Sequence, residues 1–461
     1  MRALSDWSLH YARKEFNPDE SLDWIKDLPR ARYCKDLPEQ FVGVPNVEAL
    51  GPIPSIDEIN KSVTCRPKYD RAKDIWRPLE HRLHCLPLLT EVVEPLPIHF
   101  ALWNAISINV RHRQMRLNYF KRHRRELEFG LDQKPVQLKD CYSNRLKSPA
   151  PAILVCGPTG SGKNNAIESC LNIFPYQACW HEKYTDGRPI NLAQVVWAKI
   201  DCSYDATISG IAYGLFGSLD DALGTNYLGE FVDKRLTNDT LLAFWQRLAV
   251  KHSLAVLWVD EVNCLVEGGK ADGKLILNFF LKVSNLLGIV IIFSGTNAAS
   301  GLFASKAHNA RRVCTGGTFE IELYPNAKDE TFSELFLRPI FRYQWVKNPV
   351  PYGNGYRDVI FELTCGIHAI VVLLWLLTQK EAIESGLETI SVKLLREVYA
   401  KQLKPLHAAL EAARQGDTSK YEDLLPLKDA LKKIISQAAK TDLERAKAFL
   451  LAHRRGRKTS K

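Results

Sequence analysis

The sequence lacks the features that would place the chain in a membrane or among disulfide-rich secreted proteins. Its eleven cysteines are an odd number, and no two of them form a C-x-x-C pair, which favours free thiols in a reducing compartment. The longest apolar run, "AIVVLLWLL" at residues 369–377, is far shorter than the ~20 residues that span a bilayer, so we expect a buried helix there. The first residues contain no apolar signal segment. We therefore expect a cytoplasmic protein without a membrane partner.

Two further absences concern metal ligands and repeats. "HRLHC" at residues 81–85 is not followed by a second ligand pair, so the spacing of a zinc site is incomplete and we expect none. The sequence also has no internal repeat and no low-complexity tract. What is present in excess is positive charge: 62 Lys and Arg against 52 Asp and Glu give a net charge of +10. This charge favours a polyanionic partner, with an uninvolved basic surface as the alternative.

Composition divides the chain into four segments. Residues 1–97 are rich in proline and poor in periodicity, and we expect an irregular extension that packs on the body or extends from it. Residues 98–327 begin with a basic helix and then alternate apolar strands with helices, which predicts an α/β domain with a parallel sheet. Residues 328–426 predict a helical domain, with an amphipathic helix interrupted at Pro405, and residues 427–461 a basic tail. The predicted strands are "AILVC", "VVWAKIDC", "LAVLWVDE", "GIVIIFSGT" and "TFEIELY".

The strongest motif follows the first predicted strand. "GPTGSGKNN" fits the phosphate-binding pattern G-x-x-x-x-G-K-[ST], except that Asn164 takes the place of the hydroxyl residue. A strand, a glycine loop and a helix N-terminus surround the phosphates with backbone N–H groups, and Lys163 adds positive charge beside the β and γ oxygens. We expect ATP as the cofactor. The predicted nucleotide-binding residues are Gly157, Pro158, Thr159, Gly160, Ser161, Gly162, Lys163, Asn164 and Asn165.

A second element supports the prediction of a nucleotide site. "LAVLWVDE" is an apolar strand that ends in Asp260 and Glu261. Asp260 is placed to hold Mg²⁺ through water, with the side-chain carbonyl of Asn164 as a neutral second ligand. Glu261 is placed to orient or deprotonate the attacking water, and two solvated carboxylates at a strand end are the alternative. Because Mg²⁺ tolerates misplaced ligands poorly, we expect nucleotide binding to be intact and ATPase activity to be slow.

Two later segments supply candidates for the rest of an ATPase site. "FSGTN" ends a strand that we expect between the first and third, so Thr296 or Asn297 is a candidate sensor of the γ-phosphate. A simple turn residue is the alternative. "NARRVCTGG" places Arg311 and Arg312 before the last strand, where either is a candidate arginine finger for a neighbouring subunit. A solvated basic turn is the alternative for these two.

With these segments in place, the sequence resembles TnsC, the AAA+ ATPase regulator of bacterial transposons that choose their targets through selector proteins. The resemblance covers about residues 98–426, where "VVWAKIDCSYDATI", "LNFFLKVSNLLGIVIIFSGT", "NARRVCTGG" and "HAIVVLLWLL" follow the family in order and spacing. "GKNN" departs from the G-K-T-T that the family usually carries. The resemblance implies a P-loop AAA+ fold with a five-stranded parallel sheet, a helical C-terminal lid and an irregular N-terminal extension.

The same resemblance implies a role in DNA transposition and recombination. The family assembles on double-stranded DNA as a homo-oligomeric ring or filament, with about six or seven subunits per turn. A target-selector protein recruits the assembly, and the assembly in turn activates the transposase subunits. Hydrolysis of ATP would dissolve the assembly. We therefore expect a bacterial, nucleoid-associated regulator.

Two basic segments are candidates for DNA contacts. In the ring that the resemblance implies, loops near the second strand face DNA, which makes Lys183 and Arg188 candidates. The basic helix supplies the other set, whose members are Arg111, Arg113, Arg116 and Lys121. For both sets a solvated basic face is the alternative.

Two other functions stay open from the sequence alone. The first is a nucleotide-locked scaffold, with the same fold and partners but with hydrolysis nearly lost through Asn164. The second is an origin-recognition or helicase-loader ATPase, which shares the fold but would load a helicase. A turnover assay with and without DNA separates the first alternative, and a partner pull-down separates the second.

Overall fold

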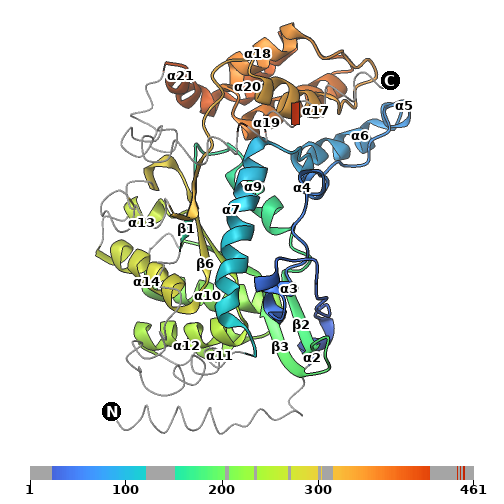
Figure 1. Ribbon diagram of the computed structural model, residues 1–461. Coiled ribbons are helices and arrows are strands. Elements are labelled where there is room, and N and C mark those ends of the chain that lie inside the picture. Colours follow the sequence, from blue (N-terminus) through green and yellow to red (C-terminus); the bar gives the residue numbers. More distant parts are fainter. Residues whose placement is uncertain are drawn as a thin grey trace.

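The computed structural model has a layered α/β body with a helical domain at one end (Figure 1). No single helix among the residues described below is long and apolar enough to cross a membrane. One bent pair of helices, 355–364 and 368–384, meets the length and composition test only when taken together, and its large apolar side chains pack in the core of the helical domain. The structure describes residues 23–120, 151–202, 207–232, 236–267, 271–299, 303, 315–415, 444, 447, 450 and 451.

The body is built on a five-stranded parallel sheet with the order β4-β5-β6-β1-β7. Every residue of β1, β5 and β6 is buried, as expected for strands covered on both faces. The fold class predicted from the sequence is confirmed, and β6 lies between β1 and β5 as predicted. The five strands are β1 (Ala152–Cys156), β4 (Trp197–Asp201), β5 (Val256–Asp260), β6 (Val290–Gly295) and β7 (Thr318–Glu320).

Helices cover both faces of this sheet (Figure 1). Because side chains alternate along a strand, Ile153 and Val155 of β1 face one helical layer and Leu154 and Cys156 face the other. The first layer consists of α7 (Pro97–Gln114) and α9 (Lys163–Leu171). The second layer contains α10 (Ile208–Leu223), α12 (Asn238–Lys251) and α14 (Ala271–Leu287), with the short α11 (Tyr227–Val232), α13 (Cys264–Glu267) and η4 (Asn297–Ala299) beside them.

A β-hairpin that the sequence did not predict precedes β4. Strands β2 (Ala178–Lys183) and β3 (Pro189–Val195) pair antiparallel, and the turn between them is closed by a hydrogen bond from Tyr184 N to Arg188 O (2.8 Å). Inside the hairpin His181 Nε2 bonds to Gln194 Oε1 (2.9 Å). The segment of Lys183 and Arg188, which we took for a loop, therefore consists of the ends of two paired strands and the turn between them.

The described part of the N-terminal extension, residues 23–97, has no core of its own and lies along the side of the body, from the hairpin to the helical domain (Figure 1). Its apolar side chains Leu50, Ile59 and Val63 pack into the cluster around α7 and α9. Its short elements are α2 (Asp23–Asp27), η1 (Glu39–Phe41), α3 (Pro45–Glu48), α4 (Ile56–Val63), α5 (Arg71–Asp74), α6 (Leu79–Cys85) and η2 (Leu86–Glu91), and η3 (Met115–Leu117) follows α7.

The helical domain, here called the lid, follows β7. The apolar run at residues 369–377 lies in its central helix, where Val371, Leu374 and Trp375 are buried, and the break at Pro405 separates two helices. Both features were predicted. The elements of the lid are η5 (Thr331–Leu337, π-helical), α17 (Arg338–Phe341), α18 (Asn354–Thr364), α19 (His368–Glu384), α20 (Val392–Gln402), η6 (Lys404–Leu406) and α21 (His407–Gln415).

One buried ion pair joins the N-terminal extension to the lid. The guanidinium of Arg82 on α6 donates to both carboxylate oxygens of Glu388 (2.7 Å each) and to Trp345 O (3.0 Å). Arg82 is 2% exposed, so the pair is shielded from water and strongly directional. The extension is thus fastened to the lid as well as to the body.

Candidate nucleotide site

The phosphate loop connects β1 to α9 and has the geometry of an anion cradle. Gly160 and Gly162 have φ angles of 77° and 92°, a region that favours glycine. A Cβ at Gly157 would lie 2.7 Å from the backbone oxygen of Ile321, so the loop also needs glycine there for space. Lys163 Nζ donates to the carbonyl oxygens of Gly157 and Pro158 (2.9 Å each). The ammonium group therefore lies over its own loop, where incoming phosphate oxygens would replace these carbonyls.

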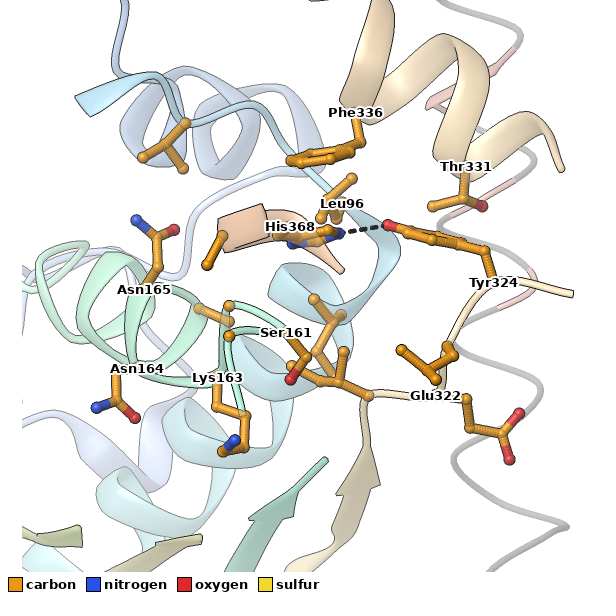
Figure 2. A pocket seen from close by; sticks show the side chains of 18 of the residues that line it. Leu96, Ser161, Lys163, Asn164, Asn165, Glu322, Tyr324, Thr331, Phe336 and His368 are labelled. Carbon is orange, nitrogen blue, oxygen red and sulfur yellow. Dashed lines mark hydrogen bonds between the residues drawn. The ribbon is translucent and has the colours of Figure 1, made fainter. Parts of the chain in front are cut away.

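A cavity of about 1120 Å³ opens between the phosphate loop and the lid. One wall is the loop itself with Glu261 and Thr296 at the ends of β5 and β6. The opposite wall comes from the start of α7, the segment after β7, η5 and α19. Figure 2 shows Ser161, Lys163 and Asn164 on one side and Phe336, His368 and Tyr324 on the other. The volume is in the range of small-molecule and cofactor sites.

The lid touches the phosphate loop directly. Ala369 N at the start of α19 donates to Gly160 O (3.0 Å), and a Cβ at Gly162 would lie 3.0 Å from His368 Nδ1. The His368 ring stacks on Phe336 with 3.9 Å between centroids, and its Nε2 bonds to the Tyr324 hydroxyl (2.7 Å). Burial lowers the pKa of His368 to about 3. A neutral, stacked imidazole therefore lies beside the glycine loop.

Within the described part of the chain, three buried polar atoms of the cavity lining have no hydrogen-bond partner: His99 Nε2, Ser161 Oγ and Thr318 Oγ1. His99 Nδ1 accepts a hydrogen bond from Leu96 N (2.9 Å), and burial lowers the pKa of His99 to about 4. The neutral ring therefore carries its proton on Nε2. An unpaired buried donor is costly, so His99 Nε2 is a point of unmet hydrogen bonding in the wall of the cavity.

Asp260 at the end of β5 is buried and accepts hydrogen bonds on both carboxylate oxygens. Its Oδ1 accepts from Ser294 Oγ (2.6 Å) and from Glu261 N (2.9 Å). Its Oδ2 accepts from Asn164 Nδ2 (2.6 Å) and forms an ion pair with Lys199 Nζ (3.1 Å). Burial disfavours the charge of Lys199, but the hydrogen bonds and charges of Asp260 and Asp201 raise its pKa overall.

The predicted Mg²⁺ ligands do not fit that ion. An ionised carboxylate offers about four acceptor positions, and the four donors around Asp260 use them all. Because the carboxylate only accepts, Asn164 must turn its NH₂ toward Asp260 rather than the carbonyl that we expected to bind metal. Lys199 adds a positive charge at the same oxygen, which opposes a divalent cation. Asn164 and Asp260 therefore do not fit Mg²⁺ in this arrangement, and their role as its ligands stays a prediction.

The other predicted catalytic residues lie near the same end of the sheet. Glu261 is exposed, lines the cavity and has a φ of 54°, a strained value for a non-glycine residue. Thr296 is buried and lines the cavity. Asn297 is buried, with its Nδ2 3.4 Å from Glu320 Oε1. Their catalytic roles remain predictions.

Two of the predicted DNA-contact residues on the basic helix are buried. Arg111 and Arg113 are each 1% exposed; Arg111 donates to Pro52 O (3.0 Å) and Arg113 to Ser284 O (3.1 Å). Both guanidinium groups hold backbone carbonyls inside the protein, so the prediction that they contact DNA is corrected. The side chain of Arg116 and the residues Lys121, Arg311 and Arg312 lie outside what the structure describes.

The hairpin candidates are on the surface. Lys183 ends β2 and Arg188 lies in the turn, and both are exposed. Arg188 pairs with Asp186 (2.7 Å) and covers the ring of Phe120, 3.7 Å from its centroid. Their contact with DNA stays a prediction.

Three residues of the site were missed by the sequence analysis: Lys199, His99 and His368. A signal existed for Lys199, since "WAKID" places a lysine inside an apolar strand that pairs in parallel with the strand of Asp260. For the two histidines no motif marks the position. Lys447, in the predicted tail, also lines the cavity, with Asp329 3.6 Å away.

One comparison with known proteins, a family match, agrees with the fold. Residues 146–303 match the model of an AAA domain, and no curated protein matches the chain. The solved structures include the Aeropyrum pernix ORC2 protein, with 12% identity over 67% of this chain and 84% of that one and a TM-score of 0.39. A Walker-type ATPase of Pyrococcus abyssi has 14% identity over 65% and 76%, with a TM-score of 0.37. The Aeropyrum pernix ORC1 protein in complex with DNA has 13% identity over 64% and 67%, with a TM-score of 0.39.

At TM-scores of 0.37 to 0.39 these likenesses carry no argument about the chain, and the family match is the comparison that bears on its fold. The matched segment begins before β1 and reaches past β6, so it contains the phosphate loop and the end of β5. The sheet order, the loop and the matched domain together give this chain the P-loop α/β fold of AAA+ ATPases, with a helical lid and an irregular N-terminal extension.

Proposed function

We propose that this protein is a nucleotide-binding switch that holds a nucleoside triphosphate between its phosphate loop and its lid and hydrolyses it slowly. The observation that carries the proposal is the cavity of about 1120 Å³, which has the phosphate loop on one wall and the lid helix α19 on the other. The backbone N–H of Ala369 in α19 is hydrogen-bonded to Gly160 of the loop. Binding of phosphates to the loop therefore affects the position of the lid directly. Nucleotide occupancy is thereby coupled to lid position.

The lid side of the cavity suits a purine base. Phe336 and the neutral ring of His368 supply flat surfaces, and Leu96 and Val372 supply apolar ones. The Nε2–H of His99 offers a donor without a partner, which matches the ring-nitrogen acceptors of adenine. ATP is therefore the ligand that we assign to the site.

The contacts of Asp260 support slow hydrolysis of ATP. Hydrolysis in P-loop enzymes depends on a metal-held geometry around the γ-phosphate, and Asp260 is engaged by Asn164 and Lys199 instead. Of the functions left open by the sequence, this arrangement favours the nucleotide-locked scaffold over a fast ATPase. Glu261 and Thr296 are retained at the cavity for a residual reaction.

We propose that the protein binds DNA and acts in transposition, the role that the resemblance to TnsC implies. In that role the ATP-bound protein assembles on double-stranded DNA, links a target-selector protein to the transposase, and uses Arg311 or Arg312 between subunits. The net charge of +10 and the exposed Lys183 and Arg188 support DNA binding. An origin or helicase-loader function is the second candidate, because the AAA domain match is compatible with this function as well as with a role in transposition.

Electron microscopy of the protein with DNA and a non-hydrolysable ATP analogue tests this proposal. We expect multimers on DNA that require the nucleotide. If the protein binds nucleotide but forms no multimers on DNA, the DNA-bound assembly is wrong while the nucleotide switch stands. A pull-down then distinguishes the two candidates, since a transposase or selector supports the first and a replicative helicase the second.

A further inference from the structure

The carboxylate of Asp260 lies in a closed ring of interactions formed entirely by this chain. Trp258 Nε1 donates to Ser294 Oγ (2.6 Å), and Ser294 Oγ donates to Asp260 Oδ1 (2.6 Å). Lys199 Nζ lies 3.1 Å from Asp260 Oδ2 and 4.4 Å above the centre of the Trp258 ring. Trp258 and Ser294 are buried. The ring therefore fixes both the orientation of the carboxylate and the place of the ammonium group.

Lys199 is held far more firmly than an ordinary surface lysine. It lies at the centre of β4, paired with Trp258 of β5, and its ammonium contacts the carboxylates of Asp260 and Asp201 (3.1 and 3.2 Å) as well as the indole face. A cation between two carboxylates and an aromatic face has lost most of its freedom before any ligand arrives. It is a positive charge held beside Asp260, on the carboxylate oxygen that also accepts from Asn164 at the start of α9.

We propose that Lys199 and Asn164 take the place of Mg²⁺ beside Asp260, so that this chain binds a nucleoside triphosphate without a divalent cation. This inference rests on the proposed nucleotide site and specifies the form of its ligand. Lys199 neutralises the carboxylate that would otherwise repel the phosphates, and Lys163 supplies the charge at the phosphates themselves. Asn164 occupies the remaining acceptor of Asp260 through its NH₂, so no position is left there for a metal-bound water.

The test is the affinity for a fluorescent ATP analogue in excess EDTA and in excess Mg²⁺. For the parent protein we expect dissociation constants within about twofold of each other, because the fixed ammonium is present in both buffers. Binding that weakens about tenfold or more in EDTA overturns the inference and leaves the nucleotide switch standing. No binding in either buffer overturns both.

The double variant Asn164→Thr, Lys199→Met supplies the second arm of the test. Asn164 is exposed and methionine keeps the apolar stem of Lys199, so the fold is retained; a thermal melt checks this. Without the ammonium, Asp260 faces the phosphates uncompensated, and binding should weaken about tenfold or more in EDTA and recover in Mg²⁺. Equal affinity in the two buffers for this variant would show that Lys199 and Asn164 do not replace the cation.

Lys347→Met is the matched control. Lys347 is a half-exposed lysine (44%) that pairs with Glu388 (3.7 Å) in the lid, and Lys199 has a comparable exposure of 35%. The control removes one charge and one ion pair at a distance from the phosphate loop. Its affinity in both buffers should equal that of the parent, and a Mg²⁺ dependence in this control would assign the effect to net charge alone and refute the local role of Lys199.

Discussion

The two sides of the cavity differ in chemistry and in the part of the nucleotide that each would bind. The core side, formed by the phosphate loop and the ends of β5 and β6, is charged: Lys163 and Glu261 line the cavity, and the Asp260–Lys199 pair adjoins it through Asn164. The lid side, formed by the start of α7, the segment after β7, η5 and α19, is mainly aromatic and apolar, with His99 buried and His368 half-buried, and the carboxylates of Glu322 and Asp329 also line it. The comparison teaches that phosphate binding and base selection are physically separable here. A substitution on one side should leave the task of the other side intact.

The largest expected effect is on the core side, from Lys163→Ala. Loss of the ammonium over the loop should weaken ATP binding by about 100-fold, or about 2.7 kcal/mol, while any preference among bases is retained in what binding remains. Titration with the fluorescent analogue measures this. Lys393→Ala, which changes an 87% exposed lysine of the lid, is the control. Unchanged affinity in Lys163→Ala would remove the phosphate loop from the site.

The next effect is on the lid side and depends on pH. The pKa of His99 is about 4 in the folded chain against an ordinary 6.5, so the unfolded chain binds a proton between these values that the folded chain does not. Stability is therefore complete above pH 6.5 and falls as the pH drops, by about 2 kcal/mol at pH 5 for this one histidine.

Urea unfolding at pH 7.5 and pH 5 measures this dependence. His99→Asn keeps an acceptor for Leu96 N but cannot titrate, so it should lose about 2 kcal/mol less than the parent between the two pH values. His81→Asn, at an exposed histidine, should behave like the parent. Identical pH slopes for parent and His99→Asn would mean that His99 is protonated in the folded protein.

The third expected effect is faster ATP hydrolysis, and it tests the roles that we assign to Asn164 and Lys199 on the core side. Freeing Asp260 with Asn164→Thr, Lys199→Met should raise kcat in Mg²⁺ about tenfold, equivalent to about 1.4 kcal/mol of barrier. A phosphate-release assay measures the rate. Adding Glu261→Gln should abolish the gain, because that carboxylate would orient the water. If the double variant is no faster than the parent, turnover is limited elsewhere, for instance between subunits.

The smallest effect concerns selectivity on the lid side. His99→Phe removes the Nε2–H donor but keeps a flat ring, so the preference for ATP over a pyrimidine triphosphate should fall about fivefold, or about 1 kcal/mol. Competition between nucleotides measures the preference, with His81→Phe as the exposed control. A preference that survives in His99→Phe would assign base selection to other groups of the cavity.

The core side could be predicted from the sequence because its determinants are local. The glycine loop and the strand ending in Asp260 are short motifs with their own geometry, and the continuous apolar strands predicted the sheet. The motif did not reveal Lys199, because its role depends on the pairing of β4 with β5. It also did not reveal that the amide of Asn164 would donate rather than coordinate.

The lid side could not be predicted, because it is assembled from segments far apart in the chain. His99 precedes β1 and His368 follows β7, and no spacing rule joins them. The hairpin β2–β3 was missed because its strands mix buried and exposed polar residues. Arg111 and Arg113 looked like surface charge because composition does not show which helix face is buried.

The ion pair of Arg82 and Glu388 has a mechanical consequence for any change of the lid. Leaving one partner of a buried pair uncompensated costs about 3–5 kcal/mol, which exceeds what a modest rotation can supply. The lid and α6 must therefore turn together as one rigid lever, with the hinge in the segments that join this lever to the body, after β7 and before α7. The lever also includes Tyr69, whose hydroxyl donates to the Gln344 carbonyl of the lid. A partner that binds α6 would thus move the lid side of the nucleotide cavity without contacting the cavity itself.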